Sequence, residues 1–141
     1  MMTSSDRPLN ATNPSGLPSQ NNGMKLHIVV DGAVVATGLL DANPSAADFA
    51  SLLPLTLHLQ DYEATEKIAD LPRKLSTASA PRSYTPSSGD ICFYAPWGNI
   101  AFFYQDGASS DELVRLGYLE SGLDRLKKCT RQSLVADLCL V

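Results

Sequence analysis

The stretch of sequence that decides the fold is MKLHIVVDGAVVAT, residues 24–37. Its first half alternates apolar side chains with Lys25 and His27, and this period of two is typical of a half-buried β-strand. Asp31-Gly32 follows. An Asp-Gly pair between two such runs is a strong hairpin signal, because a type I′ turn needs a positive φ at both central residues. We therefore predict two antiparallel strands joined by a tight turn.

Beyond this hairpin, the sequence predicts one helix and several more strands. Asn43 is a good N-cap, and Pro44 suits the first helical position, where its missing N–H costs nothing. Pro54 ends the helix. Leu55, Leu57 and Leu59 alternate with polar residues, which predicts another one-sided strand. The later strands are predicted at 90–95, 100–105 and 113–119, and a terminal helix from about Ser121.

These elements predict a barrel. About seven short strands follow one another at hairpin distances, which favours an antiparallel sheet, and few helices are present to cover it. Closure hides both the apolar face and the edges of such a sheet. Residues 61–67 are expected to form a polar connection, and residues 76–89 a long loop. The predicted fold class is mainly β: a closed antiparallel β-barrel with one middle helix and one C-terminal helix.

The chain divides into three segments. Residues 1–23 contain 15 residues of the turn-favouring types Ser, Asn, Pro, Thr and Gly, so we expect a flexible extension. Residues 24–128 are expected to form the barrel domain. Residues 129–141 are expected to be a C-terminal tail that docks on a neighbour or extends the last helix.

Composition excludes several classes of function. The 141 residues suit one domain, and 44% hydrophobic residues can bury a core. A net charge of −4 argues against nucleic-acid binding, and no apolar run is long enough to span a membrane. Three cysteines without C-x-x-C spacing indicate reduced thiols in a cytoplasmic protein and no metal site. The nine glycines are scattered and form no phosphate-binding loop, so no cofactor is expected.

Two long blocks of sequence carry a family resemblance. The first runs from Leu53 to Thr77 and includes TEKIADLPRKLST, and the second runs from Pro86 to Tyr104 and includes YAPWGNIAFFY. They resemble the small bacterial cyclophilin-like domain family, and the likeness extends over roughly residues 24–126. The resemblance implies a closed cyclophilin-like β-barrel with a groove on one side. It implies no particular reaction.

The link between two strands, residues 96–99, is the centre of the candidate site. Trp97 offers apolar area beside the two-way hydrogen-bonding amide of Asn99, a combination typical of binding surfaces. A structural corner is the alternative. In that case Gly98 takes a positive φ, Asn99 caps the turn and Trp97 folds back over the end of the barrel.

A polar rim is predicted beside this corner, from Tyr62 and Glu66. Glu66 could instead be structural and accept backbone N–H groups of its loop, and Lys67 is expected in a solvated surface ion pair. The predicted ligand-binding residues are Tyr62, Glu66, Arg73, Tyr94, Trp97, Asn99 and Phe103.

Two classes of function remain open. The first is a binding module whose groove takes a small molecule or an extended peptide. The second is a peptidyl-prolyl isomerase, which needs an apolar pocket for the proline ring and an arginine beside the twisting amide. Arg73, Trp97, Phe103 and Gln105 supply similar chemistry without a matching linear arrangement. An arginine in an apolar pocket would favour the enzyme, whereas Tyr, Trp and Asn without a central arginine would favour binding.

Overall fold

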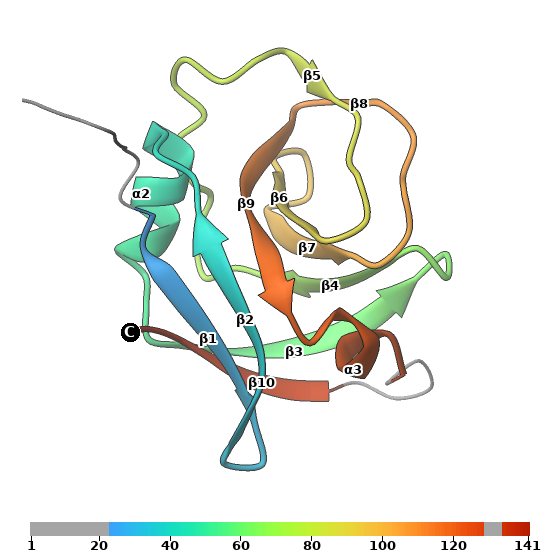
Figure 1. The fold of residues 1–141 in the computed structure, drawn as a ribbon. Helices are drawn as coiled ribbons and strands as arrows, with labels where there is room; N and C mark the ends of the chain where they lie inside the picture. The colour runs from blue at the N-terminus through green and yellow to red at the C-terminus, as the bar shows by residue number, and fades with distance from the viewer. Residues whose placement is uncertain (1–22, 129–133) are drawn as a thin grey trace, which may run out of the picture.

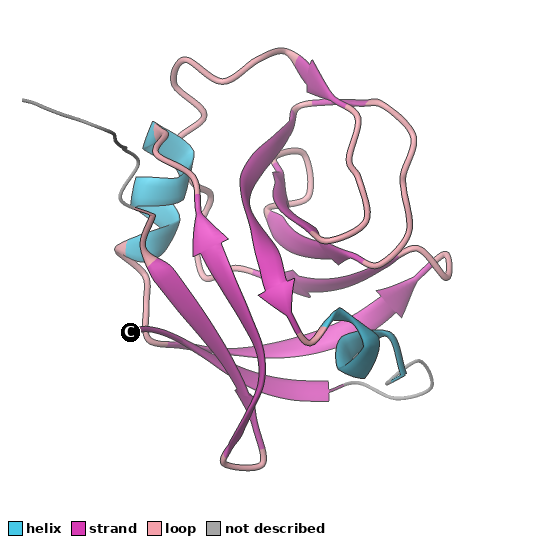
Figure 2. Cartoon of the chain, viewed as in Figure 1, coloured by secondary structure: helices cyan, strands magenta, loops and turns pink. Residues whose placement is uncertain are grey.

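The computed structural model describes residues 23–128 and 134–141. Within them, eight strands close into an antiparallel barrel, as predicted (Figures 1 and 2). Helix α2 (Pro44–Ala50) follows the first hairpin, and α3 (Leu123–Lys128) lies in the sequence between the last two strands of the barrel. A separate two-stranded sheet pairs β5 (Ser83–Tyr84) with β8 (Ser110–Asp111). In order round the barrel, the strands are β1 (Lys25–Val30), β10 (Leu134–Leu140), β3 (Leu55–Tyr62), β4 (Glu66–Asp70), β7 (Asn99–Phe103), β6 (Asp90–Tyr94), β9 (Leu113–Ser121) and β2 (Ala33–Leu40).

The local signals at the first hairpin and at helix α2 are confirmed. Asp31 and Gly32 have φ values of 52° and 79°, so both central residues of the β1–β2 turn are left-handed. Asn43 caps α2, and its Oδ1 accepts a hydrogen bond from the Ala46 N–H at 2.7 Å. The N-terminal extension predicted over residues 1–23 lies outside the described residues except for Gly23.

The connection predicted at residues 61–67 is wrong, because strands fill most of it. β3 continues to Tyr62 and β4 begins at Glu66. The turn between them places Glu63 and Ala64 at φ values of 56° and 51°, and the Thr65 N–H donates to the Tyr62 carbonyl at 3.0 Å. This left-handed turn contains no Gly or Asn, so the sequence carries none of the usual hairpin signals there.

The boundary predicted at residue 128 is also corrected, because the C-terminal segment is part of the barrel. β10 pairs with β1 on one side and with β3 on the other, so it closes the barrel instead of docking outside it or extending α3 (Figure 1). Ala136 and Leu138 point inward and are fully buried. Residues 129–133 lie outside the described part of the chain.

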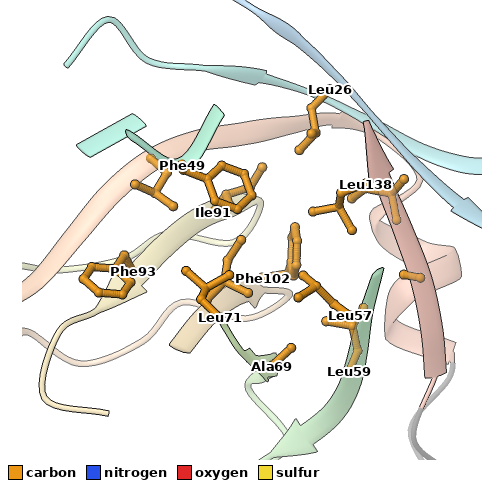
Figure 3. Packing of buried hydrophobic residues seen from close by; sticks show 14 of the residues in the cluster. Leu26, Phe49, Leu57, Leu59, Ala69, Leu71, Ile91, Phe93, Phe102 and Leu138 are labelled. Carbon is orange, nitrogen blue, oxygen red and sulfur yellow. The ribbon is translucent and has the colours of Figure 1, made fainter. Parts of the chain in front are cut away.

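Alternation along each strand separates an inner core from an outer face. Inward side chains such as Leu26, Ile91, Phe93 and Phe102 interdigitate in the barrel interior (Figure 3). The outward alternates of β6, β7 and β9 form a second apolar cluster on the outside of the barrel. This outer cluster consists of Cys92, Ala101, Phe103 and Leu113, with Ile68, Tyr84 and Tyr94 packed against it.

Candidate ligand-binding site

Strand register gathers most of the predicted site residues on the outer face of the barrel. Tyr62 of β3 lies opposite Glu66 of β4, and Glu66 in turn lies opposite Phe103 of β7. Tyr94 of β6 lies opposite Asn99 of β7. Directly opposed residues of an antiparallel pair share a face, so four neighbouring strands present these five side chains together.

These side chains line a cavity of about 360 Å³. Its floor is the sheet, and the far wall comes from the segment that follows β7. Gly107 of this segment packs so tightly that an added Cβ would lie 2.8 Å from Pro86 Cγ and 3.0 Å from Phe103 Cε2. The lining residues are Tyr62, Glu63, Thr65, Glu66, Tyr94, Trp97, Asn99, Phe103, Asp106, Gly107, Ala108, Ser110 and Leu113.

Trp97 stands at the rim of the cavity and does not plug the barrel. It lies in the β6–β7 turn, where Gly98 has the positive φ (67°) expected of a structural corner. The indole is nevertheless 55% exposed, and its ring meets Tyr62 and Tyr94 edge-on, at centroid distances of 5.6 and 5.4 Å. The corner and the exposed aromatic surface therefore coexist at this turn.

Asn99 brings to the cavity an amide without a hydrogen-bond partner in the part of the chain that the structure describes. The residue is only 4% exposed. Among the described residues, no hydrogen bond to its side chain is found, so it does not cap the turn through its amide. Because the residue lines the cavity, its amide is available to a molecule inside the cavity.

The carboxyl group of Glu66 is half-buried in the same wall. Burial, together with repulsion from Glu63, raises the pKa of Glu66 to about 7. The predicted structural role, in which Glu66 accepts loop N–H groups, is wrong: within the described residues no N–H donates to this carboxylate. Glu66 is thus a carboxyl group whose charge is not stabilised by the fold itself.

A buried cluster behind the wall fixes the β3–β4 turn. Lys67, predicted to be solvated, is instead 1% exposed, because strand alternation turns it away from the outer face. Its Nζ lies 3.5 Å from Asp61 Oδ1, which also accepts a hydrogen bond from the Tyr104 hydroxyl. Asp61 Oδ2 accepts from the Ala64 N–H at 3.1 Å. The cluster therefore holds the turn that carries Tyr62 and Glu63.

Arg73 is the one predicted site residue that the structure does not bring to the cavity. Its guanidinium forms a two-pronged contact with Asp48 of α2, at 2.8 and 3.0 Å. The hydrogen bonds from Arg73 and from the Ser76 N–H (2.7 Å) hold the pKa of Asp48 at about 2. Arg73 thus ties the segment after β4 to the helix. Gln105 is exposed and also lies outside the cavity lining.

Several lining residues were not predicted. Glu63 and Thr65 fall within residues 61–67, where the sequence predicts only a polar connection and no site residue other than Tyr62 and Glu66. The segment 106–110 carries no motif, and its place over Phe103 depends on contacts with Pro86, which lies about 20 residues away in sequence. Leu113 belongs to a predicted strand, and only the closed barrel brings β9 beside β6.

Comparison with known proteins agrees with this architecture. A family model described as the cyclophilin-like family matches residues 28–136. The chain belongs to the cyclophilin-like family. The solution structure of a hypothetical protein from Archaeoglobus fulgidus matches 84% of this chain and 95% of its own, with a TM-score of 0.58 and 17% identity. At that identity the likeness concerns the fold alone. No curated protein matches the chain.

The described residues of this cyclophilin-like protein contain neither a membrane-spanning helix nor a cluster of metal-ligating side chains. None of its described helices is both long and apolar enough to cross a membrane. Residues 23–128 and 134–141 contain no group of three or more His, Cys, Asp or Glu side chains that could hold a metal ion. Cys92 and Cys139 are free thiols, and Cys129 lies outside the described residues.

Proposed function

We propose that this cyclophilin-like domain is a binding module whose outer cavity takes a small molecule or an extended peptide and catalyses no reaction on it. The observation that carries the proposal is the amide of Asn99, a residue only 4% exposed, which lines an aromatic-walled cavity and has no hydrogen-bond partner among the described residues. This amide is therefore available to donate a hydrogen bond to a ligand or to accept one from it. Aromatic rings beside a small number of polar groups that fix the orientation of a ligand are typical of small-molecule sites.

The alternative, peptidyl-prolyl isomerase activity, receives no support from the cavity. An isomerase needs an arginine near the twisting amide, and no arginine is among the residues that line the described cavity. Arg73 is held by Asp48, and Gln105 is not among the residues that line the cavity. Tyr, Trp and Asn without a central arginine are the combination that favours binding.

Ligand binding can be followed by the intrinsic tryptophan fluorescence of the protein. Trp97 is the only tryptophan of the chain and stands at the cavity rim, so its fluorescence reports on this site. We would titrate the full chain with a set of neutral, cationic and anionic small fragments and with an acetylated Ala-Pro dipeptide amide. Saturable changes that disappear in Asn99→Ala and persist in Gln105→Ala, whose amide lies outside the cavity, are the expected result.

Two results would contradict the proposal. If no fragment or peptide gave a saturable change, or if Asn99→Ala and Gln105→Ala behaved alike, the cavity would not be a binding site. Acceleration of Xaa-Pro isomerisation at micromolar protein would contradict the claim that no chemistry is involved. We expect no acceleration.

A further inference from the structure

Four aromatic side chains form the walls of the cavity, and their relative orientation suits a particular kind of ligand. The Trp97 ring is nearly perpendicular to Tyr62 (86°) and to Tyr94 (78°), so it meets both rings edge-on and stacks on neither. Phe103 lies beside them, opposite Glu66 in the strand register, and we call these four side chains the aromatic box. The face of an aromatic ring is electron-rich, so a ring face that borders the cavity attracts a cation.

The charges around the cavity have a single sign. Three carboxyl groups line it, those of Glu63, Glu66 and Asp106. No Lys, Arg or His is among the residues of the described lining. The nearest buried cation, Lys67, points to the inner side of β4 and lies beside Asp61. An anionic ligand such as a phosphate or a carboxylate would meet repulsion here, whereas a cation would be attracted.

Glu66 is the carboxyl group best placed to gain from a cation. It lies between Tyr62 and Phe103 in the register, on the aromatic wall, and its charge lacks a donor among the described residues. Asp106, by contrast, already accepts the Ser88 N–H at 2.8 Å. A positive group within the cavity would therefore stabilise the ionised form of Glu66 and bind most tightly when that form is present.

We propose that the cavity selects an organic cation, an ammonium group with a short polar arm. The aromatic box and Glu66 would hold the ammonium group, and the amide of Asn99 would bond to the arm. The inference rests on the proposed binding function and names its ligand class. The cavity and the buried Asn99 amide are observations independent of the carboxyl groups, so the proposal does not depend on acidic residues alone.

The test uses three probes of similar shape: a cation, its neutral isostere, and an anion in which a carboxylate replaces the hydroxymethyl arm. Choline carries the cation, 3,3-dimethylbutan-1-ol is its neutral isostere, and 3,3-dimethylbutanoate is an anion of similar shape. Each is titrated into the full chain at pH 8 and followed by Trp97 fluorescence. We expect choline to bind at least about tenfold tighter than the neutral isostere, and the anion to bind most weakly.

Two variants distinguish the effect of the Glu66 charge from the effect of removing one negative charge elsewhere on the protein. Glu66→Gln keeps the shape of the side chain, and we expect it to lower choline affinity about tenfold while leaving the neutral isostere unchanged. Glu120→Gln removes a carboxylate that lies 3.5 Å from Lys25, outside the cavity, and should change neither probe. Thermal melting of each variant checks that it is folded.

Binding should also depend on pH. The titratable groups around Glu66 are Tyr62 on β3, Glu63 in the turn, Cys92 and Tyr94 on β6, and Tyr104 and Asp106 after β7. Glu66 itself has a pKa of about 7, so choline affinity should rise between pH 5 and pH 8. The rise should be absent in Glu66→Gln.

The outcomes distinguish this inference from the binding function on which it rests. If the neutral isostere binds as tightly as choline, or if Glu66→Gln has no effect on choline, the cation proposal is wrong while the cavity remains a binding site. If none of the three probes binds, the cation proposal is likewise wrong. The fragment titration with Asn99→Ala then decides separately whether the cavity binds anything.

Discussion

The half-buried carboxyl group of Glu66 should couple the stability of the protein to pH. Its pKa is raised from the ordinary 4.5 to about 7, so the folded state keeps a proton that the unfolded chain has already released. The contribution of Glu66 to the free energy of unfolding is therefore fully present at low pH, and it is lost as the pH rises from about 4.5 to about 7.

Glu66→Gln removes this loss, and we expect the variant to be more stable than the natural protein at pH 8. The side chain is partly exposed and solvent screens its charge, so the gain should be about 1 kcal/mol. Urea unfolding of both proteins between pH 4 and pH 8 measures it. If the free energies of unfolding of the two proteins differed by the same amount at every pH in this range, the proposed pKa shift of Glu66 would be wrong.

Trp97 should matter for binding far more than for folding. The side chain is half-exposed and contacts Tyr62 and Tyr94 only at ring edges, so Trp97→Ala should cost about 1 kcal/mol of stability. The same change should weaken ligand binding by about 2 kcal/mol or more. Because Trp97→Ala removes the fluorescent indole, calorimetric titration is used to measure binding to this variant. The ligand is a fragment that the natural protein binds.

Phe93→Ala is the matched control for Trp97→Ala. Phe93 lies on β6, four residues before Trp97, and is fully buried in the barrel interior (Figure 3). Its truncation should cost about 3–5 kcal/mol. Equal losses of stability in the two variants would show that Trp97 is a core residue after all.

Residue chemistry alone located part of the candidate site. Trp97 and Asn99 were recognisable because an aromatic residue and an amide stood in a turn between two strands. Arg73 has equally suitable chemistry, but its partner Asp48 lies 25 residues away, and no local pattern indicates that pairing. Lys67 was misread for a related reason, because its burial depends on the strand register of a connection that appeared to be a loop.

At the scale of elements, β10 should be as important to the barrel as any strand. Leu138 is fully buried between β1 and β3, whereas Leu140, two residues later, is 40% exposed. Leu138→Ala should therefore destabilise the protein by about 2–5 kcal/mol, and Leu140→Ala by less than about 1 kcal/mol. Chemical denaturation of the two variants compares them directly. Two small and equal effects would mean that the segment packs loosely.

The strands that sequence could predict are those with local signals. The β1–β2 hairpin has its Asp-Gly turn, and β3 has alternating leucines. The segment that forms β10 reads LVADLCL, in which every residue except Asp137 is apolar, so its hydrophobic pattern has no clear period. Its partners β1 and β3 are more than 70 residues away, and no turn connects it to either. The position of β10 is therefore determined by closure of the barrel and not by a local sequence signal.

At the scale of the whole molecule, the barrel separates the residues that form its core from the residues of the candidate site. The inner core holds the fold together, while the cavity is built on the outer alternates of β3, β4, β6 and β7, beneath the segment after β7. Both sets of side chains come from the same strands and alternate along them. Exposed or partly exposed residues of the cavity can therefore be changed with little effect on the barrel, which makes the binding predictions testable in folded protein.

Truncation at the two ends should have opposite effects on the fold. Removal of residues 1–23 takes away a segment so polar that we expect it to bury little area. The Met24 carbonyl, which accepts a hydrogen bond from the Leu40 N–H (3.0 Å), stays in place. We expect the thermal midpoint to stay within a few degrees, since about 1 kcal/mol shifts a domain of this size by several degrees. Circular dichroism melting of the shortened chain provides the comparison.

Removal of residues 129–141 should instead prevent cooperative folding. Without β10, both β1 and β3 become open edges, each with a row of backbone N–H and C=O groups that lack a partner, and the interior loses Ala136 and Leu138. Open edges of this kind also pair between molecules, so the shortened protein should aggregate on concentration, as light scattering would detect. A soluble product that melted cooperatively near the midpoint of the full chain would show that β1 and β3 can close the barrel without the strand between them.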